Sequence, residues 1–263
     1  MLKSGARIAG YTVGKSLGQG KLGEVFNAEQ PETDRRAVIR LVASTLVLVP
    51  EAIDQLFAGL RSVNQLPAPS IQGYLAFGTL ESGHVYVVSE HLTGERLSEH
   101  ITRVGALPVD DAIALALQLA AGLQIAQKRK LTHYELTPDK VMVLPDVGAP
   151  FGGRRAIIRD MGYPRSGPEL FDSKLDVLRL GAILYLLIAG KMPALAVREA
   201  MTELGKKKPN LPAPLGSLLG TMLTVEESAR PSIAQVVDRL KAMLPSSAPS
   251  ASGGASKASA GGA

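Results

Sequence analysis

Residues 18–25 are Gly18-Gln19-Gly20-Lys21-Leu22-Gly23-Glu24-Val25, a G-x-G-x-x-G-x-V segment. Glycines lack side chains and so let backbone N–H groups approach phosphate oxygens. The pattern alone also fits a hairpin turn without a ligand, and a dinucleotide-binding fold would need a helix directly after it. Here Val25-Phe26-Asn27 alternates apolar and polar side chains, which favours a strand. The segment therefore predicts a glycine-rich turn between two strands.

The hydrophobic pattern changes once along the chain. Before residue 90, alternating runs between glycine turns predict antiparallel strands, and residues 50–66 have the apolar spacing of one helix. After Gly94 the pattern becomes helical, most clearly at residues 109–128, 176–188, 215–223 and 232–244. We expect an α+β fold in which a small, mainly antiparallel lobe with one helix precedes a larger helical lobe, with a cleft between them.

These patterns predict four parts of the chain. They are a first lobe at 1–90, a hinge at 91–94, a second lobe at 95–244 and a tail or linker at 245–263. The tail contains only Pro, Ser, Ala and Gly apart from Lys257, a composition that favours disorder because it buries too little apolar surface.

The composition favours a soluble, cytoplasmic protein. Its 263 residues include no cysteine, which excludes disulfides and thiolate metal sites. The net charge of +5 is scattered and aromatic residues make up only 4%, so nucleic-acid binding is not indicated. We expect no secretory leader and no membrane span, and residues 180–190 predict a buried core helix. The basic run at 206–208 predicts a solvated loop, with a phosphate or lipid patch as the alternative.

Further motifs follow the glycine-rich segment in a fixed order. They are Ala37-Val38-Ile39-Arg40, Tyr86-Val87-Val88-Ser89-Glu90-His91-Leu92, His133-Tyr134-Glu135-Leu136-Thr137-Pro138-Asp139-Lys140, Asp160-Met161-Gly162, Gly167-Pro168-Glu169, and the segments at 174–181 and 226–232. In this order and spacing, residues 7–244 resemble the Ser/Thr protein kinases, and most closely their bacterial members. The resemblance implies a two-lobed protein-kinase-like fold.

The resemblance also implies a cleft that binds ATP, with or without Mg. Asp160 matches the metal-binding aspartate of the family's D-F-G motif and is the implied Mg ligand. The added bulk of Val38 over the base and the small Ser89 at the back of the pocket are expected to alter its shape. The implied nucleotide-binding residues are Gly18, Gly20, Gly23, Val25, Val38, Arg40, Glu90, Leu92, Met142 and Asp160.

Most positions that carry phosphoryl transfer in the family are replaced here. The lysine that contacts the phosphates is Arg40, and its glutamate partner falls on Gly59. The catalytic aspartate is Glu135, and the lysine two residues after it is Thr137. The metal-binding asparagine is Lys140, whose ammonium about 4 Å from a divalent ion would be repelled by roughly 8 kcal/mol at an effective dielectric near 20.

Two of these replacements have alternative interpretations. Lys140 either lies against nucleotide phosphates in place of a metal ion or is a solvated lysine. Arg40 either contacts a phosphate or is a surface arginine at a strand end, because its planar fork does not reproduce a lysine.

The residues that hold the family's fold together are retained. His133, Met161 and Val63 match the hydrophobic column between the lobes, and Asp176 matches the aspartate that anchors the catalytic loop. Glu169 with Arg230 matches the buried ion pair of the large lobe. The segment from Asp160 to Glu169 is short for the family, and Ser166 is its only aliphatic hydroxyl.

A retained scaffold with altered chemistry favours a pseudokinase that acts as a regulatory or scaffolding module through protein partners. The alternative is a weak or atypical Ser/Thr kinase that uses Glu135 as base and one Mg on Asp160. A third hypothesis is a nucleotide sensor that transfers no phosphate.

Overall fold

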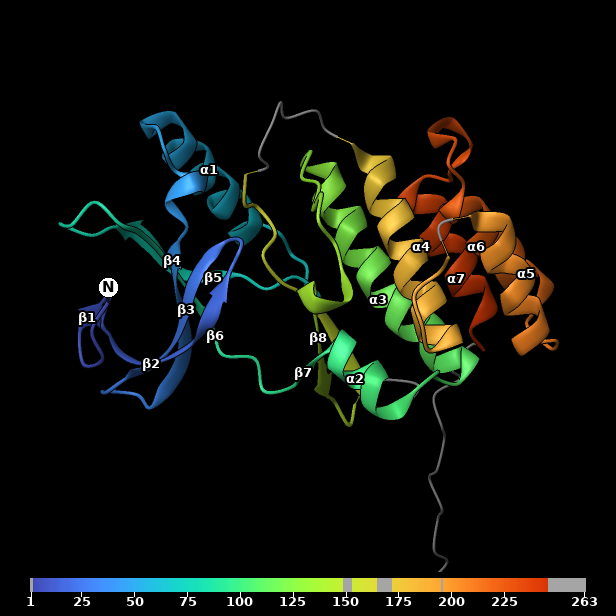
Figure 1. The fold of residues 1–263 in the computed structure, drawn as a ribbon, viewed down its shortest axis with the longest axis horizontal. Helices are drawn as coiled ribbons and strands as arrows, with labels where there is room; N and C mark the ends of the chain where they lie inside the picture. The colour runs from blue at the N-terminus through green and yellow to red at the C-terminus, as the bar shows by residue number, and fades with distance from the viewer. Residues whose placement is uncertain (1, 149–152, 165–171, 195, 246–263) are drawn as a thin grey trace, which may run out of the picture.

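The computed structural model describes residues 2–148, 153–164, 172–194 and 196–245. Its first lobe is a six-stranded antiparallel sheet in the order β1-β2-β3-β4-β6-β5, with helix α1 (Pro50–Asn64) packed beside it (Figure 1). The strands are β1 (Arg7–Ile8), β2 (Tyr11–Gly20), β3 (Gly23–Gln30), β4 (Arg35–Val42), β5 (Tyr74–Thr79) and β6 (Val85–Glu90).

The glycine-rich segment forms the turn between β2 and β3, as the sequence predicts. Gly18 pairs with Val25, and Val25 pairs with Arg40 on β4. Gly23 has a φ of +123°, and a Cβ there would lie 1.8 Å from the backbone oxygen of Leu41. This glycine is therefore required by the close approach of β4 and by its own backbone conformation.

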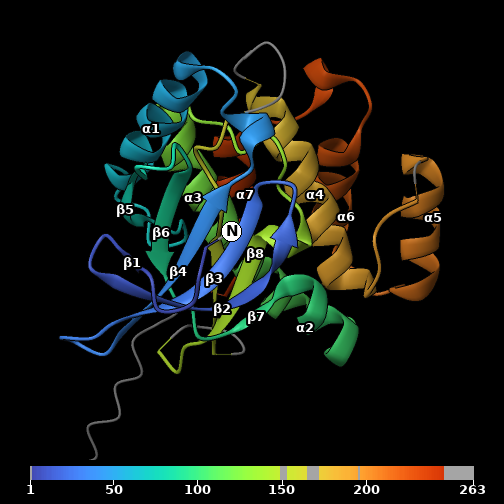
Figure 2. The same ribbon diagram turned by 60° about the vertical axis from the view of Figure 1, so that its left-hand side comes forward.

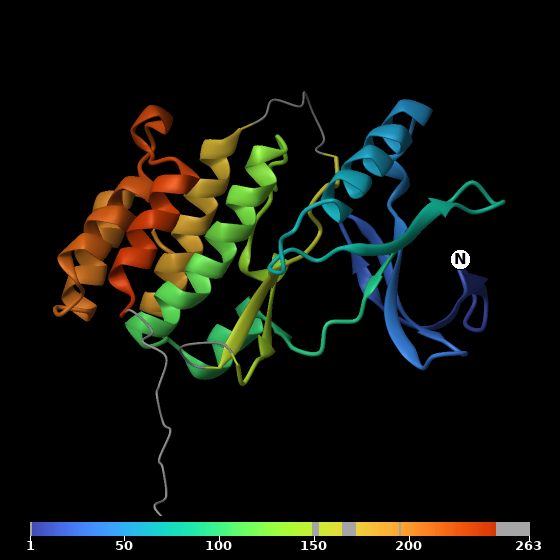
Figure 3. The same cartoon turned by 180° about the vertical axis from the view of Figure 1, so that it is seen from behind.

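The second lobe is helical and begins after the crossing from β6 to β7, which Figure 3 shows from behind. Its helices are α2 (Leu97–Val104), α3 (Val109–Lys128), α4 (Ser173–Ala189), α5 (Val197–Lys207), α6 (Ala213–Leu223) and α7 (Ile233–Met243). A small antiparallel sheet in the order β7-β8-β9 faces the first lobe and consists of β7 (Glu95–Arg96), β8 (Val141–Pro145) and β9 (Arg154–Ile158).

The α+β, two-lobed prediction is confirmed, with differences in detail. The helix predicted at 109–128 has those bounds, and the ends of the other four predicted helices lie within three residues of the observed ones. The sequence missed α2, α5 and the β7-β8-β9 sheet. The basic run at 206–208 was predicted to be a solvated loop, but Lys206 and Lys207 form the last residues of α5. α5 lies at the outer edge of the helical lobe (Figure 2).

Two apolar helices form the centre of the helical lobe. α4 contains the apolar run at 180–190 and buries ten residues, as predicted for a core helix. By length and composition, α3 is long and apolar enough to cross a membrane. No such stretch was expected from the sequence. α3 buries ten residues and packs against α4, α7 and β9, which is the arrangement of a core helix.

Candidate functional site

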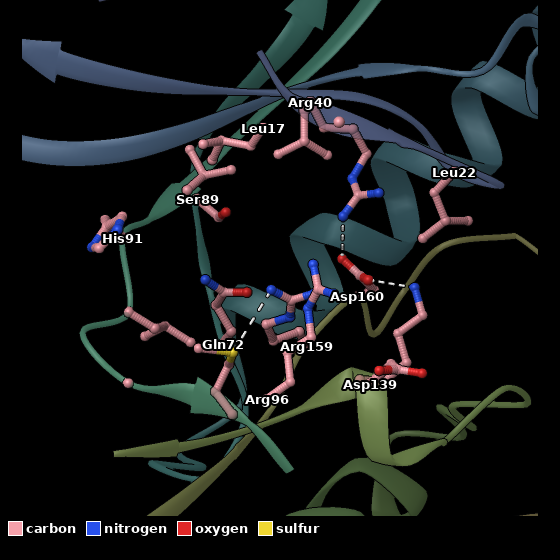
Figure 4. A pocket seen from close by; sticks show the side chains of 18 of the residues that line it. Leu17, Leu22, Arg40, Gln72, Ser89, His91, Arg96, Asp139, Arg159 and Asp160 are labelled. Atoms are coloured by element: carbon pink, nitrogen blue, oxygen red, sulfur yellow. Dashed lines mark hydrogen bonds and ion pairs between the residues drawn. The ribbon is translucent and has the colours of Figure 1, made fainter. Parts of the chain in front are cut away.

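The cleft between the lobes contains a cavity of about 570 Å³. Its walls come from the glycine-rich turn, β4, the end of β6, the hinge, β8 and the residues after β9 (Figure 4). Nine of the ten implied nucleotide-binding residues line it: Gly18, Gly20, Val25, Val38, Arg40, Glu90, Leu92, Met142 and Asp160. Gly23, the tenth, is absent from the lining and has the structural role described above.

Asp160 is held by two cations, one on each carboxylate oxygen. Nη2 of Arg40 lies 2.8 Å from Oδ1, and Nζ of Lys140 lies 2.5 Å from Oδ2 (Figure 4). Only 8% of the Asp160 side chain is exposed. Burial alone would raise the pKa of Asp160, but the charges of Arg40 and Lys140 outweigh burial and hold this pKa below its ordinary value of 3.8. Asp160 is therefore ionised and fully paired at neutral pH.

This pairing corrects the predictions for Arg40 and Lys140. The side chains are 15% and 20% exposed and engage a carboxylate, so the surface-arginine and solvated-lysine alternatives were both wrong. Arg40 also lies over the ring of Tyr163, with its Cζ 5.5 Å from the ring centroid. The hydroxyl of Tyr74, whose ring meets Tyr163 edge-on, donates to the backbone oxygen of Met161 at 2.6 Å. Arg40 thus belongs to a packed cluster around residues 160–163.

Gly59 explains why Arg40 pairs with Asp160. A Cβ at Gly59 would lie 2.2 Å from the backbone oxygen of Gly162, so the backbone of α1 contacts the backbone after Asp160 directly. No side chain fits between them, and the glutamate that the family places there could not be accommodated. Since α1 offers no carboxylate at this point, Asp160 is the acid that neutralises Arg40.

These residues do not fit a magnesium ion. Both oxygens of Asp160 are already bonded to cations, and Lys140 occupies the position of the second metal ligand. Within the described residues, no group of three or more His, Cys, Asp or Glu side chains is placed to hold a metal. The structure therefore disagrees with the implied role of Asp160 as an Mg ligand.

The catalytic-loop residues lie beside a second cavity of about 450 Å³. Glu135 lines this cavity together with Lys140 and Asp160. Thr137 lines neither cavity, and its backbone oxygen accepts a hydrogen bond from the N–H of Lys140 at 2.9 Å. The structure thus brings Glu135 near the Asp160 cluster and leaves Thr137 with a backbone role.

The residues expected to maintain the scaffold are buried. His133, Met161 and Val63 are each less than 9% exposed, and Nε2 of His133 donates to the backbone oxygen of Arg159 at 2.8 Å. Asp176 is fully buried and accepts from the N–H of His133 at 3.2 Å. Burial raises the pKa of Asp176 to about 7. These contacts fix the catalytic loop to α4.

Arg230 is buried, and its guanidinium donates to the backbone oxygens of Thr224 and Val225. Glu169, its expected partner, and Ser166 lie outside the described residues.

Sequence reasoning missed several residues of the cavity wall. Arg159 and Gln72 line the main cavity near Ser89, and Arg96 lines it from the helical lobe. Arg159 directly precedes the Asp160 motif, so its place in the chain was a usable signal. Gln72 follows α1 in a segment with no motif, and nothing in its sequence surroundings indicates the cleft.

Two lobes joined by a hinge, with a cavity roofed by a glycine-rich turn, define a protein-kinase-like domain. The sequence model of the protein kinase domain family matches residues 11–150, and the chain belongs to this family. Sperm motility kinase 3A of Mus musculus is 30% identical over 175 residues, covering 58% of this chain and 35% of that protein. The serine/threonine-protein kinase pkn3 of Myxococcus xanthus is 24% identical over 209 residues, covering 70% and 38%.

The fold is shared with solved kinase domains. The PknI kinase domain of Mycobacterium tuberculosis superposes with a TM-score of 0.74 at 22% identity, over 92% of this chain and 99% of that one. Rad53 residues 1–466, solved in complex with AMP-PNP, gives a TM-score of 0.72 at 16% identity, over 88% of this chain and 64% of that one. The chain spans about a third of the length of the curated relatives that it matches first.

Proposed function

We propose that this domain is a pseudokinase, a kinase-like module that regulates or scaffolds protein partners and does not transfer phosphate. The observation that carries the proposal is the pairing of both Asp160 oxygens with Arg40 and Lys140. Phosphoryl transfer relies on metal ions that neutralise charge developing on the phosphates, and Asp160, which matches the family's metal-binding aspartate, is engaged by side-chain cations here. We place the domain in the cytoplasm of a bacterium, by analogy with the bacterial kinases that it resembles.

The proposal includes nucleotide binding without a metal ion. The cavity has the volume of a small-molecule site, and its wall combines glycine backbone with Arg40 and Lys140. Lys140 supplies a fixed positive charge next to the place where an ion would lie. Binding of nucleotide then supports a sensing or allosteric role, in which the two lobes respond to the occupied cleft.

The competing hypothesis is a weak Ser/Thr kinase with Glu135 as base. Glu135 and Asp160 line the same cavity, which is the arrangement that this hypothesis needs. It also needs Asp160 to release both cations in order to bind a metal ion. That release would leave the partly buried charges of Arg40 and Lys140 without their carboxylate partner, which costs free energy.

A phosphotransfer assay tests the proposal. Purified wild type and an Asp160→Ala variant are incubated with γ-labelled ATP or GTP, Mg²⁺ or Mn²⁺, and generic protein substrates. We expect labelling of the protein and of the substrates to equal that of Asp160→Ala. Metal-dependent labelling by the wild type that disappears in Asp160→Ala would establish the kinase hypothesis instead.

A further inference from the structure

Arg159 is a guanidinium in the wall of the cleft, and no carboxylate of the described residues forms an ion pair with it. Its Nη1 lies 3.8 Å from the sulfur of Met142, a weak acceptor, and its Nε is buried without a hydrogen-bond partner in the described part of the chain. Within the described residues the guanidinium thus has only that weak acceptor, and its terminal N–H groups can donate to a ligand that supplies stronger ones.

The backbone around Arg159 is fixed from both sides. Its N–H donates to the oxygen of Lys140 at 2.8 Å, and its own oxygen accepts from Nε2 of His133 at 2.8 Å. In Figure 4 the side chain lies between Gln72 and Asp160. The backbone from which this side chain extends into the cavity wall is therefore fixed.

The surroundings of Arg159 leave it only partly neutralised. The charged groups that face it are Asp160, Arg40, Arg96 and Asp139, two acids and two bases. Asp160 is itself already shared between Arg40 and Lys140. Burial lowers the pKa of Arg159, and the opposing effect of Asp160 does not cancel it.

The cavity around Arg159 is suited to a flat ring. Apolar side chains line it from both lobes, with Leu17 and Val38 on one side and Leu92 and Met142 on the other. The cations Arg40 and Lys140 are grouped at Asp160, where phosphates would lie. Arg159 is thus placed beside the part of the cavity that would receive a base.

Guanidinium groups discriminate between purines. An arginine donates and never accepts, and two of its five N–H groups match the adjacent O6 and N7 acceptors of guanine. Adenine presents N7 together with the N6 amine, which would set a donor against a donor. The backbone oxygen of Glu90, an acceptor in the same wall, already accepts from Nε2 of Gln72 at 2.9 Å. An adenine amine would therefore have to share this acceptor with Gln72 by using its second lone pair.

We propose that Arg159 makes the cleft selective for nucleotides with a 6-oxopurine base, guanine or hypoxanthine, over adenine. The inference rests on the proposed metal-independent nucleotide binding and names the ligand class of that site. The triphosphate lies at the Asp160 end of the cleft, and the O6/N7 edge of the base accepts two hydrogen bonds from Arg159.

Binding of four nucleotides to the wild-type chain tests this directly. The dissociation constants of GTP, ITP, ATP and 7-deaza-GTP are measured by calorimetry in buffer with a chelator. We expect GTP and ITP to bind at least about tenfold more tightly than ATP, because a bidentate pair of this kind is worth about 1–3 kcal/mol. 7-deaza-GTP lacks the N7 acceptor and is expected to lose most of that preference. Equal or tighter binding of ATP, or of 7-deaza-GTP relative to GTP, would overturn the inference.

Substitutions at Arg159 distinguish the effect of the planar guanidinium from that of its positive charge. Arg159→Lys retains a cation that can donate to O6 and N7 without the rigid planar fork, so we expect it to keep a smaller GTP preference than the wild type. Arg159→Gln should lose the preference, with folding checked by circular dichroism. Arg96→Gln is the matched control, since it removes another cation of the same wall, and it should weaken GTP and ATP equally. A GTP preference of wild-type size in Arg159→Gln contradicts the inference.

Failure of this inference is distinguishable from failure of the pseudokinase proposal. If no nucleotide binds the wild type, the selectivity inference is overturned, whereas the phosphotransfer assay still decides whether the domain is an enzyme.

Discussion

At the scale of single residues, Lys140 and Arg40 determine what Asp160 does. Each binds one oxygen of a carboxylate that is 8% exposed. Removing one of the two cations leaves one oxygen of this buried carboxylate without its hydrogen-bond partner, which is costly. The stability of this region therefore depends on the residues that engage both oxygens of Asp160.

Lys140→Met is expected to destabilise the protein. It removes the charge while retaining an unbranched side chain, and the unfolding free energy at pH 7 should fall by about 1–3 kcal/mol. Urea denaturation measures the change. Lys21→Met is the matched control, because Lys21 lines the same cavity and forms no ion pair with the described residues; it should change stability by less than about 0.5 kcal/mol. A Lys140→Met variant as stable as this control would show that the pair contributes nothing.

The effect of Lys140→Met depends on pH in a defined direction. The folded pKa of Asp160 lies below its ordinary value of 3.8, so its pairing stabilises the fold above that value. This stability is lost as the pH falls through the folded pKa. The difference between wild type and Lys140→Met should therefore shrink in acid and be largest near neutrality.

The cleft residues could be predicted, but their pairing could not. Motif order placed Arg40, Lys140 and Asp160 in one cleft, because each aligns with a family position. Arg40 and Asp160 are 120 residues apart, and their contact depends on how closely α1 approaches residue 162. That approach is set by the absence of a side chain at Gly59, whose packing consequence no local pattern reveals.

At the scale of elements, α1 and the segment after Asp160 pack backbone to backbone. Alanine has the higher helix propensity, so Gly59→Ala would stabilise an isolated α1. In the protein the added Cβ would lie 2.2 Å from the oxygen of Gly162. We expect a net destabilisation of about 1–3 kcal/mol, as for overpacked cores, measured by chemical denaturation.

Gly205→Ala provides the control for that prediction. Gly205 lies within α5, and a Cβ there would have no atom within 4 Å. The substitution should stabilise the protein by about 0.4–1 kcal/mol. If Gly59→Ala stabilises the protein as much as Gly205→Ala does, then the close contact between α1 and Gly162 does not exist in solution.

The longest helices were predicted well from the sequence, and the shortest elements were missed. α3 has 20 residues and α4 has 17, and both are mainly apolar, so their length and composition define them. α2 has eight residues and buries only three, Leu97, His100 and Ile101, a pattern too short to distinguish from a loop. β7 has two residues, and its pairing with β8 across more than 40 positions depends on tertiary structure.

At the scale of the whole molecule, Asp176 links the catalytic loop to the core of the helical lobe. Burial raises its pKa to about 7, against an ordinary value of 3.8. Because the folded state holds this proton more tightly than the unfolded state, stability falls as the pH rises from about 4 to about 7. Asp176→Asn should remove this contribution.

Unfolding free energies of wild type and Asp176→Asn, measured between pH 4 and 8, check this prediction. The wild type should lose stability relative to the variant as the pH rises through this window. Burial lowers the pKa of His133, which acts in the opposite direction, but His133 is present in both proteins. A constant difference across the window would show that Asp176 is ionised in the folded protein at all of these pH values.

The cations of Arg40 and Lys140 fill the metal position at Asp160. Titration of Mn²⁺ followed by electron paramagnetic resonance measures this directly, for the wild type and Asp160→Ala, with and without ADP. We predict that the two proteins give the same curves, with no Mn²⁺ bound beyond what ADP binds by itself. A stoichiometric Mn²⁺ site in the wild type that is lost in Asp160→Ala would contradict the account.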